Sequence, residues 1–298
     1  MSEDVLGRLK LLQEKIMTKK RIMLLFIVFV LIVTFVIWGI HDNSALQVTK
    51  YTITSEKIPD NFNGYKIAVI SDLHNAKIGK ENEKLINMLE STKPDIIAIT
   101  GDMIDSRHTN IEVSLNFAKE AVQIAPCYYV AGNHESRIED YNDFEKKLSE
   151  IGVNILNDKQ IKIEKEGQNI SLLGVKDATF QKGHNIYSYD VFTDKKLKNF
   201  EFKSDEYTVL LAHRPEIFDV YSSYDIDLVL SGHTHGGQIR VPFIGSIAVP
   251  DQGFFPNYDV GLYTENNTKM IISKGIGNSM VPLRINNPPE IVLVTLTK

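Results

Sequence analysis

The sequence contains one cysteine in 298 residues and no excess of basic residues. A single cysteine cannot form a disulfide within the chain, and Cys127 lies in the apolar run 127–130. That context is typical of a buried strand residue rather than of a nucleophile or a metal ligand. The formal net charge of −5 gives the chain none of the positive field on which nucleic-acid binding depends, so we expect no nucleic-acid partner.

The charges are unevenly distributed along the chain. The overall composition, 43% hydrophobic and 24% charged, is that of a globular protein, and the length suits one domain with a short appendage. Residues 1–21 hold six basic and three acidic residues, a net charge of +3, which leaves −8 for the remainder. Divalent cations bound to an acidic body would reverse its local field, and their carboxylate ligands contribute to its negative charge.

A long apolar run without charged residues covers positions 22–40. As a helix, 19 residues span about 28 Å, close to the ~30 Å hydrocarbon core of a bilayer. The basic triplet 19–21 precedes the run, and Trp38 lies near its far end. The positive-inside rule then places residues 1–21 in the cytoplasm and the body outside, in a single-pass cell-membrane protein.

Two alternatives compete with an uncleaved anchor. The apolar core of a cleaved signal peptide would usually have about 7–15 residues, and no A-x-A-like cleavage site follows Ile40. A buried core helix is disfavoured because the run is apolar on all sides. We therefore interpret residues 22–40 as a transmembrane anchor.

The body is predicted to have an α/β fold. Residues 41–64 are interpreted as a linker with an edge strand at 46–53, and residues 65–298 as the catalytic domain. Alternating strands and helices give way to runs of short strands, which predicts two packed mixed β-sheets with helices outside, preceded by one transmembrane helix. The predicted strands are 65–71, 95–100, 128–131, 170–175, 207–212, 228–231, 270–273 and 291–297, and the helices 80–92, 111–124 and 141–151. The Pro-, Gly- and aromatic-rich region 242–268 is predicted to be a long ordered loop, of a kind that often covers a site.

Five predicted strands are each followed by side chains of the kinds that bind metals. The carboxyl ends of strands in an open α/β sheet border the crevice where ligands bind. Mixed nitrogen and oxygen donors suit manganese, iron, zinc, cobalt or nickel better than calcium or magnesium, and too many donors converge for one tetrahedral zinc. We therefore expect two divalent transition-metal ions, with manganese, iron or zinc as the candidates. The candidate side chains are Asp72, His74, Asp102, Asn133, His134, His213, His233 and His235.

The order Asp-x-His, Gly-Asp-x-x-Asp, Gly-Asn-His-Glu, His and Gly-His-x-His resembles the calcineurin-like metallophosphoesterase superfamily, and the similarity covers about residues 65–298. The stretches 211–215 and 236–240, with the tail 282–290, are similar to the membrane-anchored bacterial subgroup that includes YkuE- and YaeI-type enzymes. The resemblance implies an αββα sandwich. It also implies an enzyme that hydrolyses phosphoric esters or phosphoanhydrides with a hydroxide bridging two metal ions.

The resemblance further implies a role for each site residue. The implied metal ligands are Asp72, His74 and His235 for a first ion, Asn133, His213 and His233 for a second, and Asp102 for both. His134 would stand outside the ligand shell, near the leaving group, and Asp105 would orient it. An exposed loop carboxylate is the alternative interpretation of Asp105. Ser106 stands where many relatives have an arginine, so Arg107 is not assigned to the substrate.

Three functions remain open at this point. The first is a phosphodiesterase or pyrophosphatase acting on a phosphorylated envelope substrate, lipid-linked or a nucleotide sugar, which the anchor favours. The second is a broad phosphomonoesterase or nucleotidase. The third is a non-catalytic metal-binding scaffold of the same fold, against which the intact ligand set argues.

Two further sets of side chains each allow two interpretations. One set consists of aromatic residues that either line a lipid or nucleotide pocket or pack in the interior, namely Tyr221, Tyr224, Phe254, Phe255 and Tyr258. The other set consists of arginines that either contact a phosphate or form surface salt bridges, namely Arg240 and Arg284.

Overall fold

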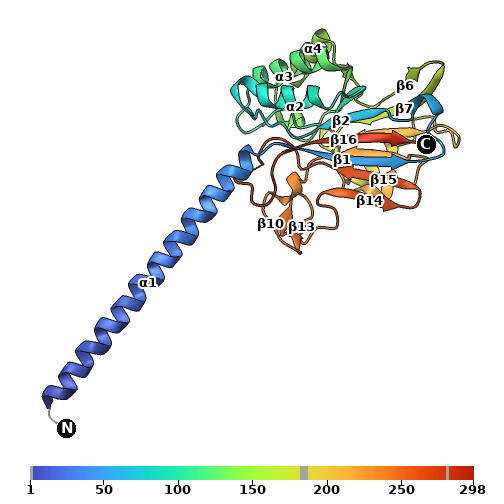
Figure 1. Cartoon of the computed structure of the whole chain (residues 1–298). Coiled ribbons are helices and arrows are strands. Elements are labelled where there is room, and N and C mark those ends of the chain that lie inside the picture. Colours follow the sequence, from blue (N-terminus) through green and yellow to red (C-terminus); the bar gives the residue numbers. More distant parts are fainter. Residues whose placement is uncertain (1–2, 182–186, 280–281) are drawn as a thin grey trace. The chain divides into compact units, whose positions relative to one another are not determined.

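The computed structural model describes residues 3–181, 187–279 and 282–298 (Figure 1). The chain divides into two compact units, one up to His41 and one from Asp42 to Lys298. Helix α1, Glu3–Ser44, makes up the described part of the first unit and continues into the start of the second. It is longer than the predicted span because residues 3–21 are rich in strong helix formers.

Part of α1, Lys15–Ser44, is long and apolar enough to cross a membrane, and a signal sequence would share these properties. Almost every side chain between residues 22 and 40 is exposed within the described structure. Such a continuous apolar surface is unfavourable in water and calls for an apolar environment.

The body contains two six-stranded mixed sheets, as the alternation of elements predicted. The first sheet has the order β1-β16-β2-β3-β4-β5, in which β2 to β5 are parallel and β16 is antiparallel to β2. Strand β1 lies at its edge and runs parallel to β16. The strand bounds are β1 Gln47–Thr54, β16 Glu290–Thr297, β2 Lys66–Ile70, β3 Ile96–Ile99, β4 Cys127–Tyr129 and β5 Asn154–Ile155.

The second sheet has the order β14-β15-β9-β8-β7-β6. Its four inner strands are parallel, and the edge strands β14 and β6 are antiparallel to their neighbours. The bounds are β14 Gly261–Glu265, β15 Thr268–Ile272, β9 Leu228–Ser231, β8 Thr208–Ala212, β7 Gln168–Val175 and β6 Lys159–Lys165.

Strand β2 shows how the layers pack. Ile67 and Val69 belong to the core between the two sheets, whereas Ala68 and Ile70 belong to the core beneath the helices. Because successive strand residues point to opposite faces, a strand buried on both faces appears in the sequence as a continuous apolar run. The two sheets and the cores on both sides of them confirm the predicted fold of two packed mixed sheets with helices outside.

Helices flank each sheet on its outer side. The first sheet is covered by the helices that Figure 1 draws above it, which are α2 Glu83–Ser91, α3 Ile111–Ile124 and α4 Tyr141–Ile151. The second sheet packs against α5 Tyr189–Leu197 and α6 Phe218–Tyr221. Single 3₁₀ turns occur at η1 Asp60–Phe62, η2 Lys80–Asn82, η3 Glu135–Arg137, η4 Ala178–Phe180 and η5 His235–Gly237.

The region 242–268, predicted to be a long ordered loop, contains short strands. It includes the antiparallel pair β12–β13, the strand β11, which pairs with β10 just before the region, and the edge strand β14. These pairs are β10 Arg240–Val241 with β11 Gly245–Ser246, and β12 Ala248–Val249 with β13 Gly253–Phe254. Strands of two residues are too short to produce a detectable periodicity in the sequence.

Candidate metal centre

The predicted ligands meet at one edge of the body. Asp102 follows β3 of the first sheet and His213 follows β8 of the second, and their side chains approach to 3.2 Å. Both sheets therefore present the carboxyl ends of their parallel strands at a common edge, as expected for an α/β ligand site. The remaining candidates follow β2, β4 and β9, namely Asp72 and His74, Asn133 and His134, and His233 and His235.

The backbone at this edge is strained. Five of the candidate ligands have positive φ, a conformation that non-glycine residues adopt at a cost of about 1 kcal/mol or more. Such a conformation turns the chain sharply just after the strand, and it brings the side chain next to the other candidate ligands. The residues are Asp72 (52°), His74 (44°), Asp102 (52°), His233 (71°) and His235 (51°).

Two glycines let the ligand loops approach each other closely. A Cβ atom on Gly132 would lie 2.3 Å from Oδ1 of Asp102, and one on Gly232 would lie 1.8 Å from Oγ of Ser71. Both distances are shorter than any tolerable contact, so each position requires a residue without a side chain.

In the first ligand cluster the Nε2 atoms of His74 and His235 lie 3.1 Å apart. The Nδ1 atom of His235 lies 3.3 Å from the carbonyl oxygen of Gly277, to which it donates its proton. The Nε2 atom of His235 therefore carries a lone pair and is a hydrogen-bond acceptor. It faces Oδ1 of Asp72 at 3.5 Å. Burial lowers the pKa of His74 to about 3, so this imidazole is neutral.

The second cluster has the same character. His213 donates Nδ1–H to the carbonyl oxygen of Thr100 at 2.8 Å, which turns its Nε2 toward the cluster. That Nε2 atom faces Oδ2 of Asp102 at 3.2 Å, Oδ1 of Asn133 at 3.1 Å and Nδ1 of His233 at 3.2 Å. Burial opposes a charge on His213, yet the nearby Asp102 carboxylate raises its pKa to about 10, so without a cation Nε2 carries a proton whose place a metal ion would take.

Acceptors that face one another in a buried site fit cations. Within each of three groups of predicted site residues the ligand atoms lie within 4.8 Å of one another, and Asp102 belongs to two of these groups; a fourth such group joins His233 to Glu216 and Asp251. In His213 and His235 the Nδ1–H group donates to a backbone carbonyl, which fixes the tautomer of the ring and leaves Nε2 as the atom that would bind a metal. The groups are Asp72, His74 and His235; Asp102, His213 and His233; and His74, Asp102 and His134.

His134 lies beside the first cluster, with its ring 4.5 Å from that of His74. Its Nδ1 accepts the backbone N–H of Ser106 at 3.0 Å and lies 3.5 Å from Oδ1 of Asp105. Asp105 instead forms its short contacts with Arg107, at 2.8 and 3.1 Å. Because Nδ1 is an acceptor, the proton of the neutral imidazole is on Nε2, and burial lowers the pKa of His134.

Glu135 received no role from the sequence, although it ends the Gly-Asn-His-Glu motif. Its carboxylate is fully buried and accepts backbone N–H groups at 2.9 Å from Asp102, 2.7 Å from Met103 and 2.9 Å from Gly132. Ile104 contributes a fourth N–H at 3.3 Å. One carboxylate thus joins the loops after β3 and β4 and positions Asp102.

Asp251 is a second residue without a predicted role. It lies in the region 242–268, 18 residues after His233, and its Oδ2 lies 3.0 Å from Nε2 of that histidine. It also pairs with the buried guanidinium of Arg214, which binds Asp177 at 2.7 Å and Glu216 at 2.8 Å. A carboxylate that accepts the second N–H of a metal-binding histidine fixes the ring and its tautomer.

The arginine interpretations fare differently. Arg240 forms a salt bridge with Asp259 at 2.7 Å. Arg284 is neither at the surface nor in a salt bridge: it is fully buried, and its guanidinium donates to backbone carbonyls, including those of Lys274 at 3.0 Å and Gly277. Arg284 therefore holds the loop that supplies the carbonyl partner of His235.

The five aromatic residues do not form one pocket. Tyr221 is buried and donates to the carbonyl oxygen of Arg214, and Tyr258 packs against Phe218. Phe254 and Phe255 are exposed.

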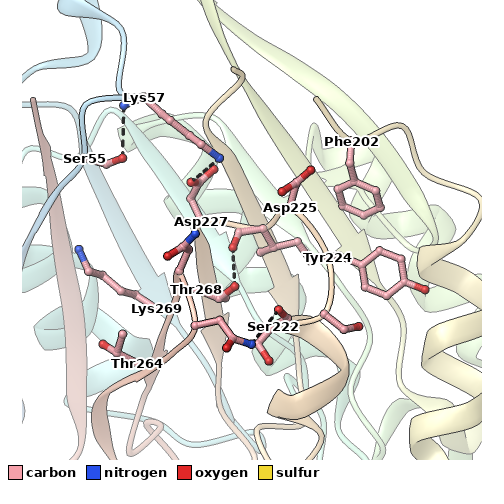
Figure 2. Close-up of a pocket in the computed structure, with 14 residues that line it drawn as sticks. Ser55, Lys57, Phe202, Ser222, Tyr224, Asp225, Asp227, Thr264, Thr268 and Lys269 are labelled. Atoms are coloured by element: carbon pink, nitrogen blue, oxygen red, sulfur yellow. Dashed lines mark hydrogen bonds and ion pairs between the residues drawn. The ribbon is translucent and has the colours of Figure 1, made fainter. Parts of the chain in front are cut away.

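A cavity of ≈ 810 Å³ lies away from the metal-type cluster (Figure 2). Its lining includes Tyr224 and an ion pair of 3.0 Å between Lys57 and Asp227. Asp227 directly precedes β9, whereas His233 follows it, so this cavity is at the opposite ends of the strands. It is separate from the site described above.

Glu135→Gln should lower both stability and metal content. The Gln amide group presents an N–H where backbone donors converge, and an unsatisfied buried donor costs about 1–3 kcal/mol. Thermal unfolding with and without a chelator, together with elemental analysis, measures both effects. The control is Glu139→Gln at an exposed position of the same loop, which should match the wild type. Unchanged metal content in Glu135→Gln would contradict the positioning role.

Asp251→Asn and Asp251→Gly should weaken the binding of one metal ion, by roughly 10–100-fold for the larger effect. Asp251 has a φ of 57°, which asparagine and glycine both tolerate, so neither variant adds backbone strain. Asparagine keeps an acceptor for His233 and should lose less affinity than glycine. Calorimetric titration with Mn²⁺ measures the affinity of each of the two metal sites. If both affinities of Asp251→Gly equal those of the wild type, Asp251 does not position His233 for metal binding.

Comparison with known proteins gives the site its family. The model of the calcineurin-like phosphoesterase family matches residues 65–237. An uncharacterized metallophosphoesterase of Aquifex aeolicus is 33% identical, over 84% of this chain and 92% of that one. The metallophosphoesterase YkuE of Bacillus subtilis is 29% identical, over 84% of this chain and 85% of its own length.

Two further likenesses concern membrane association and fold. A transmembrane protein with a metallophosphoesterase domain from Danio rerio is 28% identical, over 84% of this chain and 57% of that protein. The structure of TT1561 from Thermus thermophilus shares the fold, with a TM-score of 0.50 and 12% identity, over 72% of this chain and 91% of that one. With the clustered aspartates and histidines at the sheet edge, these matches show that the chain belongs to the calcineurin-like phosphoesterase family of metal-dependent hydrolases.

Proposed function

We propose that the protein is a two-metal phosphodiesterase or pyrophosphatase that acts on a lipid-linked or nucleotide-sugar phosphate of the cell envelope. The observation that carries the proposal is the convergence of acceptor groups at one sheet edge, with the neutral His134 beside them. We also place the chain in the YkuE-like membrane-anchored subgroup. The 29% identity to YkuE and the apolar helix support that placement.

The metal ligands are proposed as the sequence assigned them. When bound, two divalent ions supply an activated water and stabilise the charge on the phosphoryl oxygens. Glu135 and Asp251 orient the ligand loops from behind. The ligand groups are Asp72, His74 and His235 for one ion, Asn133, His213 and His233 for the other, and Asp102 for both.

His134 is proposed as the hydrogen-bond donor to the leaving oxygen. The Ser106 N–H occupies Nδ1, so the remaining proton is on Nε2, where a neutral imidazole can donate a hydrogen bond. The lowered pKa of His134 keeps it neutral through the physiological range. Asp105, 3.5 Å from Nδ1, is proposed to orient the ring indirectly: its carboxylate accepts the backbone N–H of Arg107 and so fixes the turn whose Ser106 N–H binds Nδ1.

The charges around the site favour a diester or an anhydride over a monoester. A phosphomonoester dianion brings a second negative charge to the same phosphorus. Arg107, Arg214 and Arg240 are each paired with a carboxylate and offer little net positive charge to it.

For topology, we propose that residues 22–40 span the cell membrane, with residues 1–21 in the cytoplasm and the body outside. The uncharged apolar run and the basic residues before it support this orientation. A reporter fused after Lys298 tests the proposal directly, and activity of a cytoplasm-specific reporter would reverse it.

His134→Ala should reduce turnover of bis(p-nitrophenyl) phosphate by about 10²–10⁴-fold while both metal ions stay bound. Asp102→Ala should lose metal and activity together, because its carboxylate faces both ligand clusters. Turnover with added Mn²⁺ and elemental analysis separate the two outcomes. His108→Ala, at an exposed histidine of a nearby loop, is the control. Wild-type turnover in His134→Ala would remove the donor role.

The wild-type protein should prefer bis(p-nitrophenyl) phosphate to p-nitrophenyl phosphate by at least about tenfold in kcat/KM, a difference of ~1.4 kcal/mol. Comparing the two rates in one metal-replete preparation measures this preference. A higher value for the monoester would favour a broad phosphomonoesterase or nucleotidase. Absence of turnover with either compound would favour the non-catalytic scaffold.

A further inference from the structure

Exposed apolar side chains gather on one segment of the body. We call residues 242–258 the apolar loop. Phe243 is fully exposed, and Ile244, Phe254 and Phe255 are 64%, 76% and 73% exposed. Among the described residues after α1, the other large apolar side chains counted as exposed are Tyr187, Val191, Ile247 and Leu262. Single exposed apolar residues are ordinary, but a cluster of this kind marks an interaction surface.

The apolar loop is built to hold these side chains outward. The pair β12–β13 and the pairing of β11 with the preceding β10 fix the backbone, and the N–H of Phe255 donates to the carbonyl oxygen of Ile247 at 2.9 Å. Phe243 and Phe255 have φ values of 68° and 53°. Bulky residues rarely adopt this conformation, and here their side chains are exposed.

The apolar loop borders the metal-type cluster. Asp251, within the loop, lies 3.0 Å from His233, and Arg240, just before the loop, donates its backbone N–H to Ile285 at 3.0 Å. The phenylalanines are therefore carried by a loop that also contacts a metal-site histidine.

The start of the body lies at the same edge. The carboxylate of Asp42 accepts the backbone N–H of Asn286, the residue next to Ile285. The side chain of Asn287 in turn donates to the carbonyl oxygen of His235 at 2.7 Å. Ile40 ends the apolar run only two residues before Asp42, a distance of at most about 7 Å along the chain. The apolar run is therefore joined to the body through a residue at the edge that holds the metal-type cluster.

We propose that the apolar loop inserts its phenylalanines into the surface of the bilayer that anchors the chain, so that the metal centre receives phosphate groups of membrane-embedded substrates. The proposal rests on the proposed anchor and phosphoester hydrolysis. It commits to a lipid surface because the loop has one charged residue, Asp251, which is turned toward Arg214 and His233. An uncharged aromatic surface suits the interface of a bilayer.

Fluorescence quenching tests the contact in the full chain, reconstituted in liposomes. The one native cysteine, Cys127, is buried, so Phe254→Cys can be labelled selectively with an environment-sensitive dye. The matched control is Glu150→Cys, which is 62% exposed at the end of α4, next to the amino end of β5. Lipids with brominated chains should quench the dye at position 254 and leave the dye at 150 unquenched. Equal quenching at both positions, or none at 254, would overturn the proposal.

Kinetics test the consequence for the substrate. Phe243→Asn with Phe255→Asn removes two apolar side chains at positions whose φ asparagine tolerates. Hydrolysis of a phosphatidyl p-nitrophenyl ester in liposomes should fall about tenfold, equivalent to ~1.4 kcal/mol, while hydrolysis of soluble bis(p-nitrophenyl) phosphate stays at the wild-type rate. Equal losses on both substrates would mean that the variant damages the site and would count against docking.

The two tests also separate this proposal from the proposed function. If the wild type hydrolyses neither compound, the proposed function fails, and quenching at position 254 still decides the lipid contact. The dye at position 254 could instead be shielded by a second copy of the chain, in a way that depends on protein concentration and needs no lipid. If that is found while the soluble substrate is hydrolysed, only the docking proposal fails.

Discussion

The structure depends on holding groups that carry lone pairs together at one buried point. Imidazole nitrogens, carboxylate oxygens and an amide oxygen approach to about 3 Å, an arrangement that is repulsive without positive charge. The protein prepares this arrangement with backbone atoms: carbonyl oxygens accept the Nδ1–H groups of His213 and His235, so that the Nε2 atoms face inward and would bind a cation. Left-handed turns after the strands aim the side chains inward. Stability and metal binding are thereby linked, because a bound cation relieves the repulsion that the fold imposes.

The sheet topology relates this point to the start of the body. Strand β16 runs antiparallel to β2, so its first residue, Glu290, lies at the edge where β2 ends and Asp72 begins. Strand β1 runs parallel to β16 and starts at that edge as well, with the N–H of Gln47 on the carbonyl oxygen of Pro289. The chain thus enters the body beside the metal-type cluster. A reversed β1 would have started at the opposite ends of the sheets, with no change in the ligands.

The sequence made the central strands predictable and the candidate ligands recognisable for the same reason. Strands buried on both faces are continuous apolar runs, and five of these runs are followed by a conspicuous Asp, Asn or His. Glu135 and Asp251 could not be found in this way, because their roles consist of contacts to residues distant in sequence. Ser106 acts through its backbone N–H, which any residue except proline could supply. Arg284 stands among exposed-looking loop residues, and nothing local in the sequence indicates that its guanidinium is buried among carbonyl oxygens.

The segment 242–258 combines two properties that rarely serve one purpose. Its polar side contains Asp251, held by the buried Arg214 against His233, and its outer side exposes phenylalanines in strained conformations. A soluble enzyme would gain nothing from that exposure, since solvation disfavours it and no interior contact is made. If the outer side contacts lipid, the same apolar side chains are in a favourable environment. The lipid contact that holds the loop in place would then also hold the Asp251 carboxylate against His233. The metal centre would then be most completely ordered when the protein is at the membrane, where a lipid-linked phosphate is found.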